Sequence, residues 1–243
     1  MSAPRLGRAK RNTLQSQVYR QLRRGLMSGL FPPGSILTYR SLAALLGTSA
    51  MPVREAVNRL AAERALEVWP NRSVVVPRMT RSRFLEVCEL RCMLEGYAAA
   101  RAAATATDKL IVQLRDLSNA AKRSAAGDDT AATLNRNQEF HFAIYRAADT
   151  EILLPMIEML WLQAGPLLHV SLRASPMHWN WAAHDEILDA FVRRDAAEAR
   201  RAMMQDIRNT EQHIISCADF AGEAPSANGR NSSAEADRVQ AAG

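Results

Sequence analysis

The chain has 243 residues, enough for two domains, and its formal net charge of +6 is unevenly distributed along the sequence. Residues 1–80 carry 13 Lys and Arg against 3 Asp and Glu, whereas residues 81–243 carry 18 against 22, so only the first third is basic. No apolar run approaches the ~20 residues of a membrane helix, no signal peptide is present, and three cysteines give no disulfide framework, so we expect a cytoplasmic, reduced protein without membrane contact.

The basic first third alternates helix signals with turn signals. Apolar residues share one face of an expected helix over residues 14–29, and the sequence FPPGS then breaks regular structure. Thr38 suits the N-cap of a helix that ends at Leu46, and a second helix is expected from Met51 to Arg64, after the turn GTS. The segment ALEVWPNRSVVVP, residues 65–77, holds two short β-prone runs around a turn and predicts a hairpin.

This order of helix, helix, turn, helix and hairpin predicts a winged helix-turn-helix domain over residues 13–78, after a basic disordered arm over residues 1–12. A helical packing module shares the pattern, but the basic excess favours binding to double-stranded DNA. In such a domain the start of the last helix faces the major groove, and the preceding helix and the hairpin tip reach bases or phosphates nearby. The candidate DNA contacts are Arg40, Thr48, Ser49, Met51, Arg54, Arg72 and Ser73. Each arginine alone is as readily a solvated charge, but three arginines at three tips of one motif favour DNA contact.

From residue 80 onward the sequence is rich in alanine and shows no strand signal. Helices are expected at residues 80–104, 107–126, 130–149, 151–173, 178–194 and 195–219. The last segment, residues 220–243, is small and polar, which predicts a disordered tail. The fold class is therefore mainly α: an N-terminal winged helix-turn-helix followed by an all-helical bundle over residues 79–219 that binds an effector and dimerises.

Several segments resemble a known family. The segment LAALLGTSAMPVREAVNRLAAERALEV resembles the DNA-binding domain of the GntR family of bacterial transcription regulators, most specifically at PVREAVNRL. The segments ELRCMLEGYAAARAAA, QEFHFAIYRAA and AHDEILDAFVRRDAAEARRAMMQDI resemble the helical effector domain of its FCD (FadR-like) branch, so that the resemblance covers roughly residues 13–219. It implies a homodimer on a pseudo-palindromic operator that is released or remodelled by a small effector, often a carboxylate. Two positions depart from the family: Ala50 replaces a common arginine and Ser73 a wing glycine, so base readout there must differ, for example through apolar contact with a thymine methyl.

Three expected helices of the bundle each carry one metal-binding group within an apolar stripe: His141, His184 and Asp206. Imidazole and carboxylate suit divalent transition metals, and helix bundles hold metals in this way. A lone core histidine is more often only hydrogen-bonded, but a buried aspartate needs a partner. The FCD resemblance implies an aspartate four residues before the first histidine and a third histidine after the second, and these positions hold Asn137 and Asp206. We therefore expect a metal such as zinc, nickel or manganese at His141, His184 and Asp206, with Asn137 as a weak ligand or as an effector contact.

Arg91 lies on a stripe of otherwise apolar residues, and a buried arginine needs an anion. Glu95, four residues later, is the simple structural partner, whereas an effector carboxylate would bind the guanidinium bidentately. The FCD resemblance implies an effector contact at the arginine of ELR, which is Arg91. His169 and Arg173 are further candidates for the same cavity, although a helix end with solvated charge explains them equally well.

Three functions compete at this stage. The first is an effector-responsive DNA-binding regulator, the second a metal-dependent enzyme acting on a small acid through His141, His184 and Asp206, and the third a constitutive DNA-binding protein with a vestigial effector site. We expect the regulator, acting as a repressor, and no enzyme activity. No further general base is placed near the three groups, and an enzyme would leave the DNA-binding module without a reason.

Overall fold

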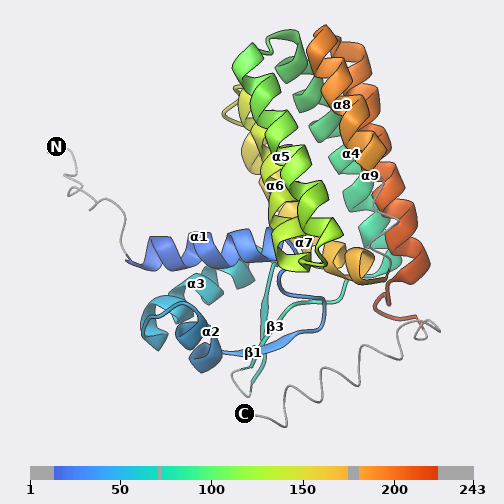
Figure 1. Cartoon of the computed structure of the whole chain (residues 1–243). Coiled ribbons are helices and arrows are strands. Elements are labelled where there is room, and N and C mark those ends of the chain that lie inside the picture. The colour runs from blue at the N-terminus through green and yellow to red at the C-terminus, as the bar shows by residue number, and fades with distance from the viewer. Residues whose placement is uncertain (1–13, 71–72, 175–180, 224–243) are drawn as a thin grey trace, which may run out of the picture.

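The computed structural model describes residues 14–70, 73–174 and 181–223 (Figure 1). The predicted basic arm and Arg72 lie outside the described residues, as do residues 224–243 of the predicted tail. The described residues form nine helices and one three-stranded sheet, which confirms the mainly α fold class. A small domain with the strands lies below one end of a helical bundle, and its first helix runs across that end (Figure 1).

The N-terminal domain is the predicted winged helix-turn-helix. Its helices are α1 (Leu14–Met27), α2 (Tyr39–Leu45) and α3 (Ala50–Ala62). Thr38 caps α2 as expected, because its side chain accepts the backbone N–H of Ser41 while the Ser41 hydroxyl accepts that of Thr38. The wing has one more strand than the predicted hairpin. Strand β1 (Ile36–Thr38) pairs antiparallel with β3 (Ser73–Val75), which also pairs with β2 (Glu67–Val68).

The six predicted helices of the second domain are all present, with ends that differ from the expected ones by no more than a turn. They are α4 (Arg81–Ala104), α5 (Asp108–Ala126), α6 (Thr130–Ala147), α7 (Leu153–Ala174), α8 (Trp181–Arg193) and α9 (Ala196–Cys217). Helix α4 packs chiefly along α9, and α5 along α6. The apolar stripes read from the sequence face the shared core, which is why each polar residue within a stripe also points inward.

Helix α7 is apolar enough, by length and composition alone, to cross a membrane, which the sequence reading did not anticipate. Half of its apolar window is buried inside the protein, however, and it packs against α1, α4, α6 and α9. These contacts explain its composition, because a helix covered on most sides must be apolar on most sides. Pro166 lies within it and is buried.

The predicted start of the disordered tail, residue 220, is wrong, because residues 220–223 are ordered against the bundle. Phe220 is 3% exposed and packs against Phe84 with ring centroids 5.6 Å apart. The Ala221 N–H donates to the Met79 carbonyl, and Glu223 pairs with Arg81. One aromatic side chain therefore holds residues 220–223 against the start of α4, although the sequence around it is small and polar.

The two domains meet where α1 lies against α7, at a close approach of two backbones. A Cβ atom built on Gly165 would lie 2.5 Å from the Met27 carbonyl oxygen, closer than any side chain tolerates. Gly29, which follows α1, has a φ of +78°, and a Cβ there would meet the Gly165 carbonyl oxygen at 2.7 Å. Glycine at both positions thus lets α1 rest directly on α7.

Candidate functional site: a metal group in the bundle pocket

The bundle encloses a pocket of about 560 Å³, counting its open mouth, lined by residues of α4, α6, α7, α8 and α9. Its lining residues are Arg91, Asn137, His141, Trp161, Leu168, Ser171, Trp181, His184, Asp206, Ile207, Asn209, Thr210 and His213. The pocket therefore contains every metal candidate named from the sequence, together with Arg91. Nine of its thirteen lining residues are polar or charged and two are tryptophans, so its walls suit a small polar ligand.

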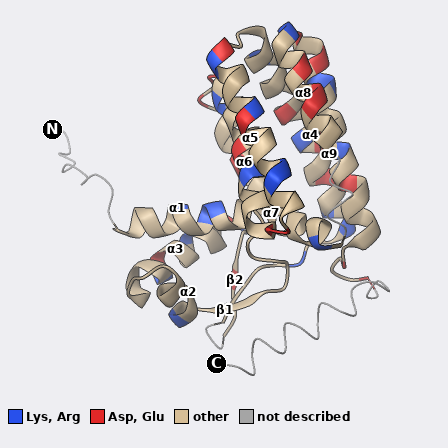
Figure 2. Cartoon of the chain, viewed as in Figure 1, with Lys and Arg blue, Asp and Glu red and all other residues tan. Residues whose placement is uncertain are grey.

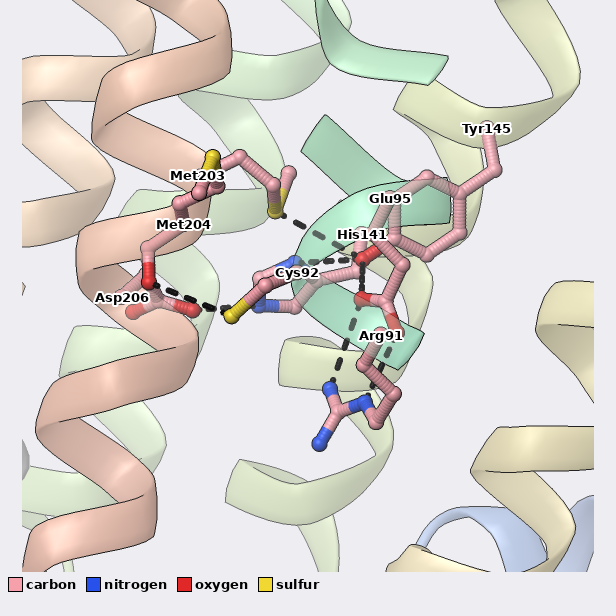
Figure 3. Close-up of polar contacts among 8 residues, drawn as sticks. All are labelled: Arg91, Cys92, Glu95, His141, Tyr145, Met203, Met204 and Asp206. Atoms are coloured by element: carbon pink, nitrogen blue, oxygen red, sulfur yellow. Dashed lines mark hydrogen bonds and ion pairs between the residues drawn. The ribbon is translucent and has the colours of Figure 1, made fainter. Parts of the chain in front are cut away.

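Three side chains from three helices meet in this pocket. His141, His184 and Asp206 are called the metal group below, because together they could hold a metal ion. The ligand atoms of His141 on α6, His184 on α8 and Asp206 on α9 lie within 4.8 Å of one another. His141 Nε2 is 3.4 Å from Asp206 Oδ2 (Figure 3). The two histidines are 2% exposed and the Asp206 side chain 16%, so the group is nearly enclosed. One divalent ion with nitrogen and oxygen ligands needs such a spacing.

The burial of these groups sets their protonation. Burial lowers the pKa of His141, and it lowers the pKa of His184 to about 3, so both imidazoles are neutral at pH 7. Burial also raises the pKa of the Asp206 carboxyl to about 7, because a charge here has little solvation. His184 Nδ1 is buried without a hydrogen-bond partner among the described residues. Neutral imidazoles, an under-solvated carboxylate and an orphaned nitrogen are a donor set that fits a divalent cation.

Neighbouring groups hold the His141 ring in place. The Tyr145 hydroxyl is 3.2 Å from His141 Nδ1, which leaves Nε2 directed at Asp206. The ring also lies 5.4 Å from the Trp161 ring and 5.2 Å from that of His184. A partner at the second ring nitrogen is what orients and tunes metal-binding histidines in general. Asn137, one turn before His141, is buried and lines the same pocket.

Arg91 has the structural partner that the sequence offered as its simpler explanation. Its Nε donates to Glu95 Oε1 at 2.7 Å, and the Tyr145 hydroxyl donates to the other carboxylate oxygen of Glu95 (Figure 3). The guanidinium also lies over the Trp161 ring, 4.7 Å from its centroid. Arg91 nevertheless reaches the pocket, so the pair with Glu95 fixes its position beside the candidate metal ligands His141, His184 and Asp206.

Two predicted effector residues lie elsewhere. His169 does not line the pocket but faces the domain junction, where it forms a hydrogen bond with the Gly29 backbone. Arg173 is exposed in the last turn of α7 and does not line the pocket either. Helical periodicity explains both positions, because Leu168 and Ser171 already occupy the face of α7 that points into the pocket. We therefore correct the expectation that His169 and Arg173 share the cavity with Arg91.

Several pocket residues are not predicted from the sequence, among them Trp161, Trp181 and His213. His213 lies outside the metal group, and its Nε2 is 3.0 Å from the Ser171 carbonyl oxygen. The tryptophans had no distinguishing signal, because an aromatic residue on a helix stripe is usually core.

The predicted DNA contacts that the structure describes lie in the turn before α3 and its first residues, at the start of α2 and in the wing. Ser49 is the N-cap of α3, the Thr48 N–H closes the turn onto the Ala43 carbonyl, and Met51 is 64% exposed. The guanidinium of Arg54 lies 5.2 Å from the ring centroid of Tyr39, which precedes Arg40 at the start of α2. Ser73 opens β3 and pairs with Thr38 across the wing. Few acidic side chains lie on this domain, whereas the bundle carries both signs (Figure 2).

The chain matches known domains over most of its length. Residues 14–76 match the domain described as "Bacterial regulatory proteins, gntR family", and residues 86–209 match the "FCD domain". It is 35% identical to the HTH-type transcriptional regulator McbR of Escherichia coli K12 over 166 residues, 68% of this chain and 75% of that protein. It is 30% identical over 200 residues to a protein of Paenarthrobacter nicotinovorans named "Probable D-xylose utilization operon transcriptional repressor", covering 82% and 88% of the two chains. The solved structure of E. coli McbR/YncC superposes with a TM-score of 0.77 at 30% identity, covering 84% of this chain and 98% of that one.

Proposed function

Since this chain belongs to the GntR family of bacterial transcription regulators, with an FCD effector domain, and is a regulator rather than an enzyme, we propose that it is a cytoplasmic, dimeric repressor whose operator affinity responds to a small carboxylate. The observation that carries the proposal is the group of His141, His184 and Asp206 beside Arg91 in one pocket. Metal ligands and a fixed guanidinium together make a site for a chelating anion.

We assign the metal to His141, His184 and Asp206, with the amide oxygen of Asn137 as a weaker fourth group. A zinc, nickel or manganese ion held there would supply a Lewis acid that binds carboxylate oxygens. The chain's own groups do the rest. Tyr145 keeps Nε2 of His141 directed at the ion position, and Arg91 offers its remaining N–H donors to an effector carboxylate that enters the pocket.

Helix α7 supports a route from effector to DNA. Trp161 and Leu168 of this helix line the pocket, and Gly165, between them, contacts the end of α1 in the DNA-binding domain. An effector that shifts α7 must therefore shift α1 or break that contact. In a dimer on a pseudo-palindromic operator, the displacement changes the spacing of the two recognition helices, and affinity changes with it.

Dimerisation is part of the same proposal. Leu90, Met93 and Tyr97 on α4 are 40%, 51% and 48% exposed and recur at helical spacing, which gives α4 an apolar face open to solvent. Such a face suits contact with the same helix of a second chain. The two α3 helices would then read two half-sites through Arg54 and Met51, with Arg40 and Arg72 on phosphates.

The deciding experiment measures the metal content of protein purified without a histidine tag, in the wild type and in His141→Ala. His213→Ala is the matched control, since His213 lines the pocket outside the metal group. We expect about one metal per chain, lost in His141→Ala and kept in His213→Ala. No metal after incubation with zinc, nickel or manganese would refute the metal centre. Operator affinity that no metal-chelating carboxylate changes would favour a constitutive regulator, in which Glu95 is the counter-charge of Arg91 and no effector is needed.

A further inference from the structure

A second cavity lies at the junction of the two domains, on the other side of α7 from the bundle pocket. It encloses about 340 Å³, counting its open mouth, and it is lined by residues of both domains. The N-terminal domain and the linker provide Arg64, Ala65, Val76, Pro77, Arg78 and Met79, and the bundle provides Arg83, Leu162, Gln163 and Pro166. Neither the sequence patterns nor the metal group accounts for this cavity.

The charges around this junction cavity are all of one sign. Three arginines, Arg64, Arg78 and Arg83, line it, and no acidic residue does. Arg83 donates to the Gln163 side chain at 2.6 Å, whereas Arg64 and Arg78 form no ion pair with any described residue. Glu63, next to Arg64 in the chain, already pairs with Arg23 and Arg59. All three arginines are exposed at the mouth of the cavity, so water screens their charges, and a bound anion would supply the counter-charge that no lining residue provides.

The position of these arginines excludes the operator as that anion. DNA is read by the beginning of α3, whereas Arg64 follows its end. A helix of 13 residues places the two ends ~20 Å apart at 1.5 Å per residue. Apart from Gln163, the rest of the lining is apolar, with Ala65 and Val76 buried and Leu162 and Pro166 supplied by α7. The cavity therefore fits a small anion with an apolar body better than a hydrated inorganic ion.

We propose that this junction cavity is a second ligand site, which binds a small organic phosphate or carboxylate between the DNA-binding domain and the bundle. Arg78 and Arg83 are its main anion contacts, because guanidinium binds phosphate and carboxylate bidentately, and Arg64 closes the site from the end of α3. The bound anion would bridge Arg64 and Arg78 of one domain to Arg83 of the other. It would thus fix α7 against the DNA-binding domain at the place where Gly165 already contacts α1.

The binding test uses the full chain after removal of metal with a chelator, so that no metal in the bundle pocket can bind the probe. Phenyl phosphate, benzoate and inorganic phosphate are titrated by calorimetry at constant ionic strength. We expect saturable binding of phenyl phosphate or benzoate at one site per chain, with inorganic phosphate at least ~10-fold weaker. The stronger of the two organic probes identifies the anion class. Binding of all three with equal affinity, or of none, would overturn the proposal.

Variants locate the site. Arg78→Gln and Arg83→Gln should each weaken binding ~10-fold or more, because each removes a charge-assisted contact. Arg115→Gln on the exposed face of α5 should leave it unchanged. Arg64→Gln is a third probe on an exposed residue, useful if either other variant unfolds. His141→Ala, which removes the metal group, should bind phenyl phosphate as the wild type does, and loss of binding in this variant would place the probe in the bundle pocket instead.

The consequence for DNA rests on the proposed function, but the binding itself does not. If the chain is a regulator, saturating probe should change operator affinity in the wild type and not in Arg78→Gln. Probe binding without any effect on operator affinity would refute the coupling and leave the site standing.

Discussion

Arg91 and Glu95 form a buried ion pair within one turn of α4, with 2.7 Å between Nε and Oε1 and side chains only 6% and 0% exposed. The Tyr145 hydroxyl donates to the same carboxylate from α6. Two of the five N–H donors of the guanidinium are thus used by Glu95, and the others remain for the pocket. The pair turns Arg91 into a fixed donor, whereas a lone arginine would have to be ordered by each effector that binds.

We expect Glu95→Gln to lower the free energy of unfolding by ~3 kcal/mol, because it leaves the buried Arg91 charge without its counter-charge. Tyr145→Phe is the matched variant, which removes one hydrogen bond to the same carboxylate and should cost ~1 kcal/mol. Urea denaturation followed by circular dichroism measures both values. Equal stability of wild type and Glu95→Gln would mean that a protein group or water not described here already balances Arg91.

Asp206→Asn should stabilise the metal-free protein at high pH. The folded-state pKa of Asp206 is raised to about 7 from an ordinary value of 3.8, so the folded protein holds this proton more tightly than the unfolded chain does. Stability is therefore lost as the pH rises from about 4 to 7, by an amount on the order of 4 kcal/mol. Asparagine has no proton to lose, so the variant should match the wild type near pH 4 and exceed it at pH 8.

Thermal melts from pH 4 to 8 with chelator present test this sign, with Asp189→Asn on the exposed face of α8 as the control. Added metal should reverse the order at pH 8, because only the wild type keeps all three ligands. A wild type that is the more stable protein at pH 8 without metal would contradict the raised pKa.

Asn137→Asp should strengthen metal binding by ~10-fold or more, because a second carboxylate joins two neutral imidazoles and Asp206 around the ion. Asn137 is buried in the pocket one turn before His141, so its side chain is already in the right place. Competition with a fluorescent chelator measures the affinity. Asn209→Asp, which also lines the pocket, controls for added negative charge alone. The same gain in both variants would show that Asn137 has no special position.

Gly165→Ala should separate the domains. The added methyl group would meet the carbonyl oxygens of Leu26 and Met27, and these are backbone atoms that cannot rotate away. We expect a cost of ~1–3 kcal/mol in thermal or urea unfolding and a larger radius of gyration in small-angle scattering. Gly127→Ala is the matched control, because its new Cβ would lie at ordinary contact distance, 3.6 Å from the nearest atom. If Gly165→Ala melts like wild type, α1 does not rest on α7 in solution.

The sequence predicted the elements whose signal is local. Each bundle helix has an apolar stripe over three or more turns, so all six helices were predicted. Because His141, His184 and Asp206 lie on these inward-facing stripes, their meeting in one pocket could be predicted as well. Strand β1 was missed because its three residues form a strand only by pairing with β3, about 40 positions later. Phe220 was missed for a similar reason, since one aromatic residue has no periodicity.

The features beyond reach from the sequence all depend on how helices from distant segments dock. From the sequence, Tyr145 is indistinguishable from other core aromatic residues, and only the packing of α6 against α4 places its hydroxyl at Glu95. His169 and Arg173 were assigned to the pocket because they lie late in the helix that contributes to it. The orientation of α7 about its own axis decides which of its residues face the pocket, and these two do not. The junction cavity lies between the two domains, and the contact of α1 with α7 at Gly165 has no signal in the sequence, because an isolated glycine in an apolar helix does not by itself predict a contact.

Arg54→Ala should weaken operator binding and show by its salt dependence whether Arg54 reads a base or a phosphate. Arg54 lies in the first turns of α3, beside Tyr39, with its side chain exposed at the end of the domain that we assign to the groove. A base contact would cost ~1–3 kcal/mol on the operator, relax the preference at one base pair and leave the slope of log affinity against log salt unchanged. A phosphate contact would instead weaken specific and random DNA alike and reduce that slope by about one. Fluorescence anisotropy at several salt concentrations distinguishes the two, with Arg115→Gln as the charge control, and unchanged affinity for both DNAs would show that α3 does not enter the groove by its first turns.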